Sequence, residues 1–223
     1  MDGGEGLTAS LAALAAVAGL LAWLIFRRFA TQRHRSHLYW GAGLALVAVT
    51  IAQEAAIYAG FRAPTFLQLY LVLVAALVGV LSMGSAELQF SRRWRLAWAG
   101  YLGTTCAVLA VVTFVTPVPS ALVVDGVVSG VPPLAVIVVS SLVTIPAAVL
   151  LIVSSLYGAW RRKRWQLLYV AGGTMVLSAS GALYLAAFPL TQYYADFVGV
   201  ALLFLGFVRL RLAPSPTAGA APS

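Results

Sequence analysis

One acidic residue, Glu54, lies well inside a long apolar stretch at 37–60. A carboxylate in hydrocarbon is costly, so in membrane proteins such a residue marks a ligand site, an ion pathway or a proton relay with a partner close by. On a helix, Thr50 and Tyr58 fall on the same face as Glu54. We therefore take Glu54 as the first candidate for chemistry, with a tyrosine or Gln68 as its expected partner.

Other polar side chains are expected at the same depth as Glu54, near one end of several apolar stretches. They predict a polar pocket that opens toward the outside of the membrane. Its candidate ligand-binding residues are Glu54, Tyr58, Gln68, Tyr184 and Asp196. The alternative interpretation is a set of satisfied interhelical hydrogen bonds with tyrosines at the membrane interface.

The sequence lacks the residues on which several familiar kinds of membrane-protein chemistry depend. The only lysine, Lys163, lies between two apolar stretches, where no Schiff base to retinal is expected. His34 and His37 stand among arginines and outside the predicted hydrocarbon region, so we expect neither haem nor metal ligation. The single cysteine, Cys106, excludes an internal disulfide and a multi-cysteine metal site. We expect no cofactor, no metal and no catalytic residue, and hence a protein that is not an enzyme.

The composition requires elements that hold these residues in a membrane. Of 223 residues, 62% are hydrophobic and 9% charged, with a mean hydropathy of +0.97. Soluble domains carry about 25% charged residues, so the composition excludes a soluble enzyme, a disordered chain and a nucleic-acid-binding domain. A membrane helix needs about 20 apolar residues. Seven stretches qualify, and they predict an all-α, seven-helix transmembrane bundle: 7–26, 37–60, 65–86, 95–115, 133–160, 165–188 and 192–211.

The basic residues predict the orientation of this bundle. Lys and Arg accumulate in the cytoplasmic loops of membrane proteins. With seven spans, Arg62 alone falls on one side, and the other thirteen of the 14 basic residues fall opposite: Arg27, Arg28, Arg33, Arg35, Arg92, Arg93, Arg95, Arg161, Arg162, Lys163, Arg164, Arg209 and Arg211. This predicts an N-terminus outside and a C-terminus in the cytoplasm. The acidic start also argues against a cleaved signal peptide.

The cytoplasmic arginine loops have an expected partner and an excluded one. We expect them to contact anionic lipid headgroups, and we expect no nucleic acid there. The tryptophans lie near the same ends, as interfacial anchors do. One ion pair is expected at this interface, between Glu87 and the neighbouring Arg92 or Arg93.

The sequence predicts a single transmembrane domain over residues 1–212 and a disordered cytoplasmic tail over 213–223. In the longest outside loop, Asp125-Gly126 stands between paired valines, a pattern that predicts a tight β-hairpin over the outer mouth. Pro146, inside the fifth stretch, predicts a kink, with Ser141 and Thr144 as expected partners for the freed backbone groups.

These features favour a non-enzymatic protein that senses a ligand or anchors a partner through the outward pocket. Any signal would pass to a membrane or cytoplasmic protein, since the loops are too short to fold into an output domain. In topology alone, the plan resembles the sensory receptor regions of bacterial signalling proteins, and also small transporters. Two alternatives stay open: a small-solute or proton-coupled transporter that uses Glu54, and a structural subunit of a membrane complex. The excess of arginine over lysine favours a prokaryotic cell membrane.

The charge distribution yields a test of topology. A reporter that is active only in the cytoplasm should be active when fused to the C-terminal tail and inactive when fused after Gly60. An inactive reporter at the tail would contradict the model with seven spans.

Overall fold

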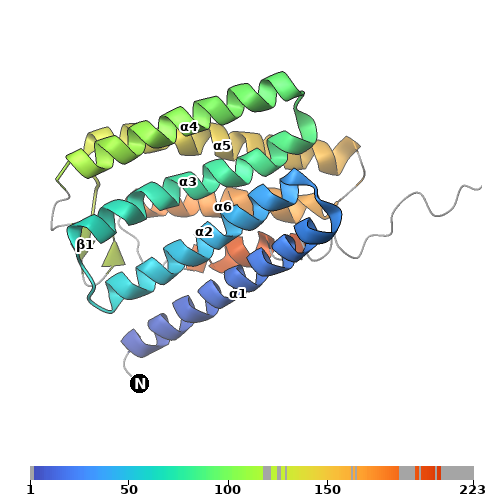
Figure 1. Cartoon of the computed structure of the whole chain (residues 1–223). Helices are drawn as coiled ribbons and strands as arrows, with labels where there is room; N and C mark the ends of the chain where they lie inside the picture. Colours follow the sequence, from blue (N-terminus) through green and yellow to red (C-terminus); the bar gives the residue numbers. More distant parts are fainter. Residues whose placement is uncertain are drawn as a thin grey trace, which may run out of the picture.

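The computed structural model describes residues 3–117, 122–124, 127–128, 130–161, 163, 165–185, 194–195, 197–203 and 205–206. This part of the chain is all-α apart from one short hairpin (Figure 1). Its elements are α1 (Gly3–Gln32), α2 (Arg35–Tyr58), α3 (Pro64–Gln89), α4 (Arg92–Val115), β1 (Val123–Val124), β2 (Val127–Val128), α5 (Leu134–Arg161) and α6 (Leu167–Leu185). Further helical residues occur at 194–195, 197–203 and 205–206.

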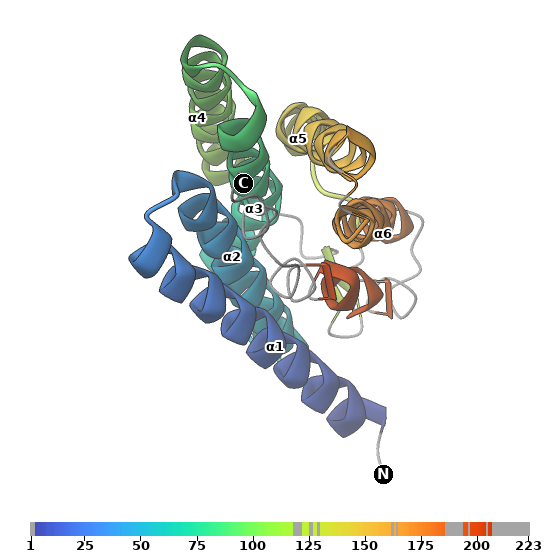
Figure 2. The ribbon, with the colours of Figure 1, turned by 90° about the vertical axis from the view of Figure 1, so that its right-hand side faces the viewer.

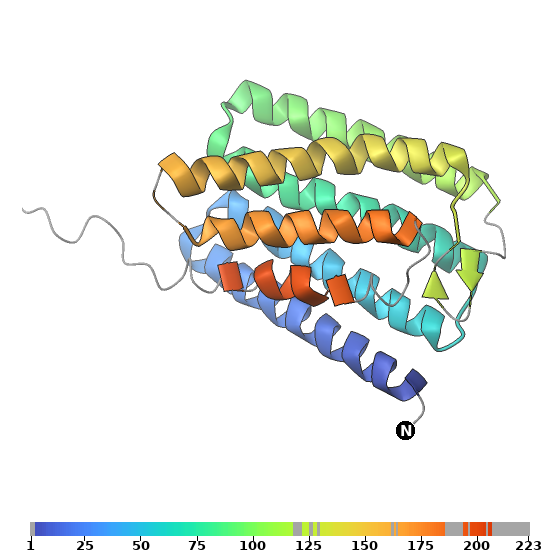
Figure 3. The same ribbon diagram turned by 180° about the vertical axis from the view of Figure 1, so that it is seen from behind.

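Helix α3 lies at the centre of the bundle, because α2, α4 and α5 all pack against it. Helix α1 lies along α2, and α6 packs against α5 (Figure 2). The helical residues 197–203 lie between α6 and α1 (Figure 3). The described helices therefore pack against one another in a single bundle.

Five of these helices, α1 to α5, are long and apolar enough to cross a membrane, and α6 contains a shorter apolar stretch at Leu167–Leu177. A membrane helix bundle is thus the architecture that the chain supports. The count of seven spans and the orientation stay predictions.

The two ends of the bundle differ in charge. Between helices, the links at residues 33–34 and 90–91 lie at one end, which we call the arginine end because arginines flank the first link and directly follow the second. The link at residues 59–63 and the hairpin lie at the opposite end, which we call the hairpin end. Among the described residues, Arg62 is the only basic side chain there. The predicted segregation of charge therefore holds in three dimensions for this part of the chain.

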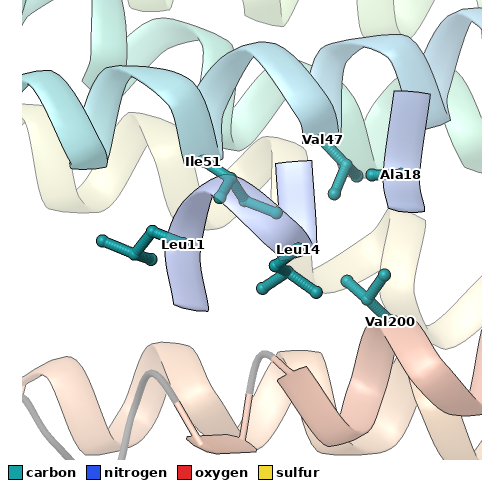
Figure 4. Close-up of a cluster of buried hydrophobic side chains, with 6 residues drawn as sticks. All are labelled: Leu11, Leu14, Ala18, Val47, Ile51 and Val200. Atoms are coloured by element: carbon teal, nitrogen blue, oxygen red, sulfur yellow. The ribbon is translucent and has the colours of Figure 1, made fainter. Parts of the chain in front are cut away.

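The first helix is an integrated member of the bundle. Its Leu11, Leu14 and Ala18 form a buried cluster with Val47 and Ile51 of α2 and with Val200 (Figure 4). In a bilayer, such packing stabilises through van der Waals contact, because lipid tails are as apolar as leucine. The expectation that the first stretch stays as a packed helix agrees with this contact.

Glycines allow the closest helix approaches. A Cβ on Gly173 of α6 would lie 2.8 Å from the carbonyl oxygen of Gly199. On Gly84 of α3, a Cβ would overlap the Trp40 ring of α2. Small residues at such crossings are the usual means by which membrane helices come into backbone contact. A larger residue at either glycine would push the two helices apart.

The predicted hairpin is present. Strands β1 and β2 pair antiparallel, with Val123 opposite Val128 and Val124 opposite Val127. This register leaves two residues for the turn, as the Asp-Gly pattern requires. Asp125 and Gly126 themselves lie outside the described residues.

Helix α5 contains Pro146 and continues through it. A proline has no N–H to give to the carbonyl four residues earlier, here that of Leu142. That carbonyl accepts a hydrogen bond of 2.6 Å from the hydroxyl of Tyr101 on α4. The Thr144 hydroxyl, expected to serve the freed group, donates instead to the carbonyl of Ser140. The partner was mispredicted because the helical pattern of α5 holds no information about the facing helix.

Replacing Tyr101 tests this contact. Tyr101→Phe removes the donor, and unfolding in detergent should become easier by about 1 kcal/mol. In a Pro146→Ala background, the new N–H can serve Leu142, so the same change should cost much less. Thermal unfolding of the four proteins gives the coupling. Equal losses in both backgrounds would contradict the role assigned to Tyr101.

Candidate functional site

Glu54 is buried near the hairpin end of α2, with 8% of its surface exposed. The hydroxyl of Tyr70 on α3 donates a hydrogen bond of 2.6 Å to its Oε1. Tyr70 is also buried, with 5% exposure. An O–H···O bond of this length is at the short end of the normal range, and such bonds to carboxylates are among the strong ones in proteins. A tyrosine was one of the two partners expected for Glu54, and it is the one found.

The link between α2 and α3 sets this geometry. Gly60 has φ of 100°, in the left-handed region that glycine adopts without strain. Its N–H donates to the carbonyl of Ile57, and the N–H of Phe61 donates to that of Ala56. This is the Schellman pattern that ends helices. Pro64 then starts α3 at a position where its missing N–H costs nothing. The tight reversal places Glu54 and Tyr70 opposite each other.

The hairpin packs over the same place. Leu122 and Val123 form a buried cluster with Ile57, Leu67 and Tyr70. Leu122 has no exposed surface, and its carbonyl accepts a hydrogen bond of 3.0 Å from the N–H of Gly130. Apolar side chains of the hairpin segment therefore cover the tyrosine that holds Glu54. The Glu54–Tyr70 pair is therefore buried beneath apolar side chains of the hairpin segment.

Two of the remaining predicted site residues, Tyr58 and Gln68, contact other parts of the bundle. Tyr58 is half-buried and packs against the cluster that α1 forms with α2. The amide of Gln68 donates to the carbonyls of Thr113 and Thr116, at 3.0 and 3.3 Å. Gln68 thus serves the last turn of α4. The side chain of Tyr184 and the whole of Asp196 lie outside the described residues.

Two buried polar residues, one beside Glu54 and one on α4, were not singled out from the sequence. Gln53 of α2 is 6% exposed, and its Oε1 has no hydrogen-bond partner within the described residues. Thr113 of α4 is 1% exposed, and its hydroxyl has none there either. A buried polar atom without a partner is costly, so it marks a place where a further polar group would be stabilising. The signal for Gln53 was its position beside Glu54, one helical step away.

The arginine end carries a single ion pair within the described residues. Glu87 of α3 pairs with Arg95 of α4, so the expectation of Arg92 or Arg93 was wrong. The reason is geometric: Arg95 lies one turn inside α4, on the face that meets α3. His34 and His37 lie with ring centroids 5.8 Å apart. The described residues contain no group of three or more side chains that could hold a metal.

Comparison with models of known protein families, with curated protein sequences and with solved structures gives no match for this chain.

Removing the hydroxyl of Tyr70 tests the central hydrogen bond. Tyr70→Phe leaves the Glu54 carboxyl without this donor in a buried setting, and should destabilise the bundle by about 1–3 kcal/mol. Tyr39→Phe is the matched control, since Tyr39 is half-buried and packs in an apolar cluster of α3, α4 and α5. Thermal unfolding of both variants is the measurement. Equal melting temperatures for Tyr70→Phe and the wild type would remove the bond from the stabilising contacts.

Proposed function

We propose that this chain is a non-enzymatic, multi-pass protein of the cell membrane that senses a ligand through the Glu54 site at its hairpin end. The observation that carries the proposal is the buried hydrogen bond from Tyr70 to Glu54 beneath an apolar cover. A carboxyl placed at such depth is expensive to keep for packing alone. The ligand would be a small molecule with a cation or hydrogen-bond donor for the carboxyl.

The arrangement offers a route by which binding would change the bundle. A ligand that reaches Glu54 competes with the Tyr70 hydroxyl and must displace Leu122 and Val123 from the tyrosine ring. Both α2 and α3 extend from this point to the arginine end. There Trp40 of α2 packs on Gly84 of α3. A shift between the two helices would therefore reach the surface where a membrane or cytoplasmic partner would bind.

Proton-coupled transport is the second candidate, because the same carboxyl can carry a proton. The two functions differ in which side of the membrane reaches Glu54. Sensing requires access from the hairpin end alone. Transport requires access from each end in turn.

Chemical labelling separates these functions. A water-soluble carbodiimide with an amine nucleophile modifies carboxyls that water reaches, and mass spectrometry of the peptides locates the adduct. In membrane vesicles of known orientation, we expect labelling of Glu54 from the hairpin end only, through the same displacement of Leu122 and Val123 that the ligand requires. Labelling from both ends would favour transport, and none from either end would favour a structural carboxyl.

Substitution then separates function from packing. Glu54→Gln keeps the shape and the hydrogen-bonding capacity of the side chain, so we expect normal insertion and thermal stability. Small molecules that raise the melting temperature of the wild type by binding should lose that effect on the variant. Tyr39→Phe again serves as the control, because it leaves the Glu54 site intact. Ligands that stabilise Glu54→Gln as well as the wild type would contradict the proposal.

A further inference from the structure

A groove of about 400 Å³ lies between α4 and α5, in the half of the bundle nearer the arginine end. Its walls are mainly apolar. They include Phe90 after α3, Trp98 of α4, and Pro146, Val149, Val153 and Ser154 of α5. Val149 and Val153 are 54% and 57% exposed, so the groove opens on the outer surface of the bundle, where lipid would lie.

Side-chain hydrogen bonds hold the two walls in place. The Tyr101 hydroxyl binds the Leu142 carbonyl one helical turn beyond Pro146. Toward the other end, the amide of Gln89 donates to the carbonyl of Ser154 at 2.9 Å. Trp98 stacks on Tyr101, with ring centroids 5.4 Å apart, and its indole N–H donates to Ser82 at 3.1 Å. The groove is therefore a fixed feature between tied helices.

The length and depth of the groove fit one acyl chain. From Pro146 to Ser154, α5 rises about 12 Å at 1.5 Å per residue. Half of the hydrocarbon core is about 15 Å thick. Pro146 lies near the middle of α5, so the groove runs from mid-membrane toward the interface at the arginine end.

The volume of the groove, about 400 Å³ along about 12 Å of α5, suits a slender apolar occupant such as a single hydrocarbon chain.

Two arginines follow closely in the chain after Phe90, the lining residue at the start of the link to α4. Arg92 and Arg93, both exposed, begin α4 two residues after Phe90. The ion pair in the described part of the chain uses Arg95, which leaves both without a carboxylate partner there. The first turn of α4 also has no acidic residue. Helix N-termini favour anions, and arginine suits phosphate.

We propose that this groove is a binding site for an anionic phospholipid of the leaflet at the arginine end. One acyl chain lies along Val149 and Val153, and the phosphate contacts Arg92 and Arg93 at the start of α4. The site is separate from the Glu54 site, at the other end of the bundle.

Native mass spectrometry of the purified full chain tests the proposal. The protein is presented with phosphatidylglycerol and phosphatidylcholine of identical acyl composition. We expect one retained phosphatidylglycerol per protein, in preference to phosphatidylcholine. Replacing both Arg92 and Arg93 by glutamine should lower its retention about tenfold. The matched control replaces Arg33 and Arg35 by glutamine, which removes the same charge from another link and should leave retention unchanged.

A second pair of variants tests the groove itself. Val153→Trp fills it and should lower retention at least fivefold, whereas Ile145→Trp, at an exposed position of α5 outside the groove, should not. Glycerol phosphate, which has the head group without acyl chains, should not displace the lipid. The proposal is overturned if the Arg33 and Arg35 variant loses as much lipid as the Arg92 and Arg93 variant, or if glycerol phosphate competes equally. It is overturned as well if a folded Val153→Trp protein, checked by circular dichroism, retains lipid like the wild type. Should Val153→Trp fail to fold, the arginine pairs decide alone.

Discussion

The absence of water in the hydrocarbon core is the constraint on which this structure depends. Every backbone group within the core must find a partner inside the protein, which makes helices the natural element of a chain this apolar. Where a backbone carbonyl has no N–H partner within its own helix, a side chain of another helix donates the hydrogen bond. Tyr101 serves the carbonyl that Pro146 cannot, and Gln68 serves the end of α4. These cross-helix bonds also fix which helices are neighbours.

The same constraint explains why the two ends of the bundle differ. At the hairpin end, a buried carboxyl is held by a tyrosine and covered by apolar side chains, which removes it from bulk water. At the arginine end, most of the basic side chains remain exposed, beside tryptophans that include Trp94 and Trp160. Aromatic and basic side chains together are typical of a lipid interface. Specific recognition of a small ligand suits the first setting, and contact with phospholipid suits the second.

The sequence was sufficient to predict the long apolar helices, the hairpin and a buried position for Glu54. Continuous apolar stretches predicted the long helices, and Asp125-Gly126 between valines predicted the paired strands. The cost of a carboxylate in a membrane singled out Glu54, which is buried. The prediction of a pocket was less informative, because its residues were grouped only by their expected depth in the membrane. Gln68 shares the depth of Glu54 but lies on the face of α3 that meets α4. Depth says nothing about direction around a helix.

Where two antiparallel helices are joined by a tight link, their sequence positions also indicate which side chains face each other. Their contacting residues stand at nearly equal distances from the link, as Glu54 and Tyr70 do, and as Gly43 and Leu81 do, on either side of residue 62. Glu87 and Arg95 are related in the same way across residue 91, as are Ser82 and Trp98 across residue 90. Arg92 and Arg93 are too near that link to have reached Glu87 in this register.

This equal spacing does not predict contacts between helices that are joined by a long link or are not consecutive. Gln89 meets Ser154, and Tyr101 meets Leu142, through packing of α3 and α4 on α5. No spacing in the chain encodes these contacts, so the walls of the lipid groove emerge only from the folded bundle.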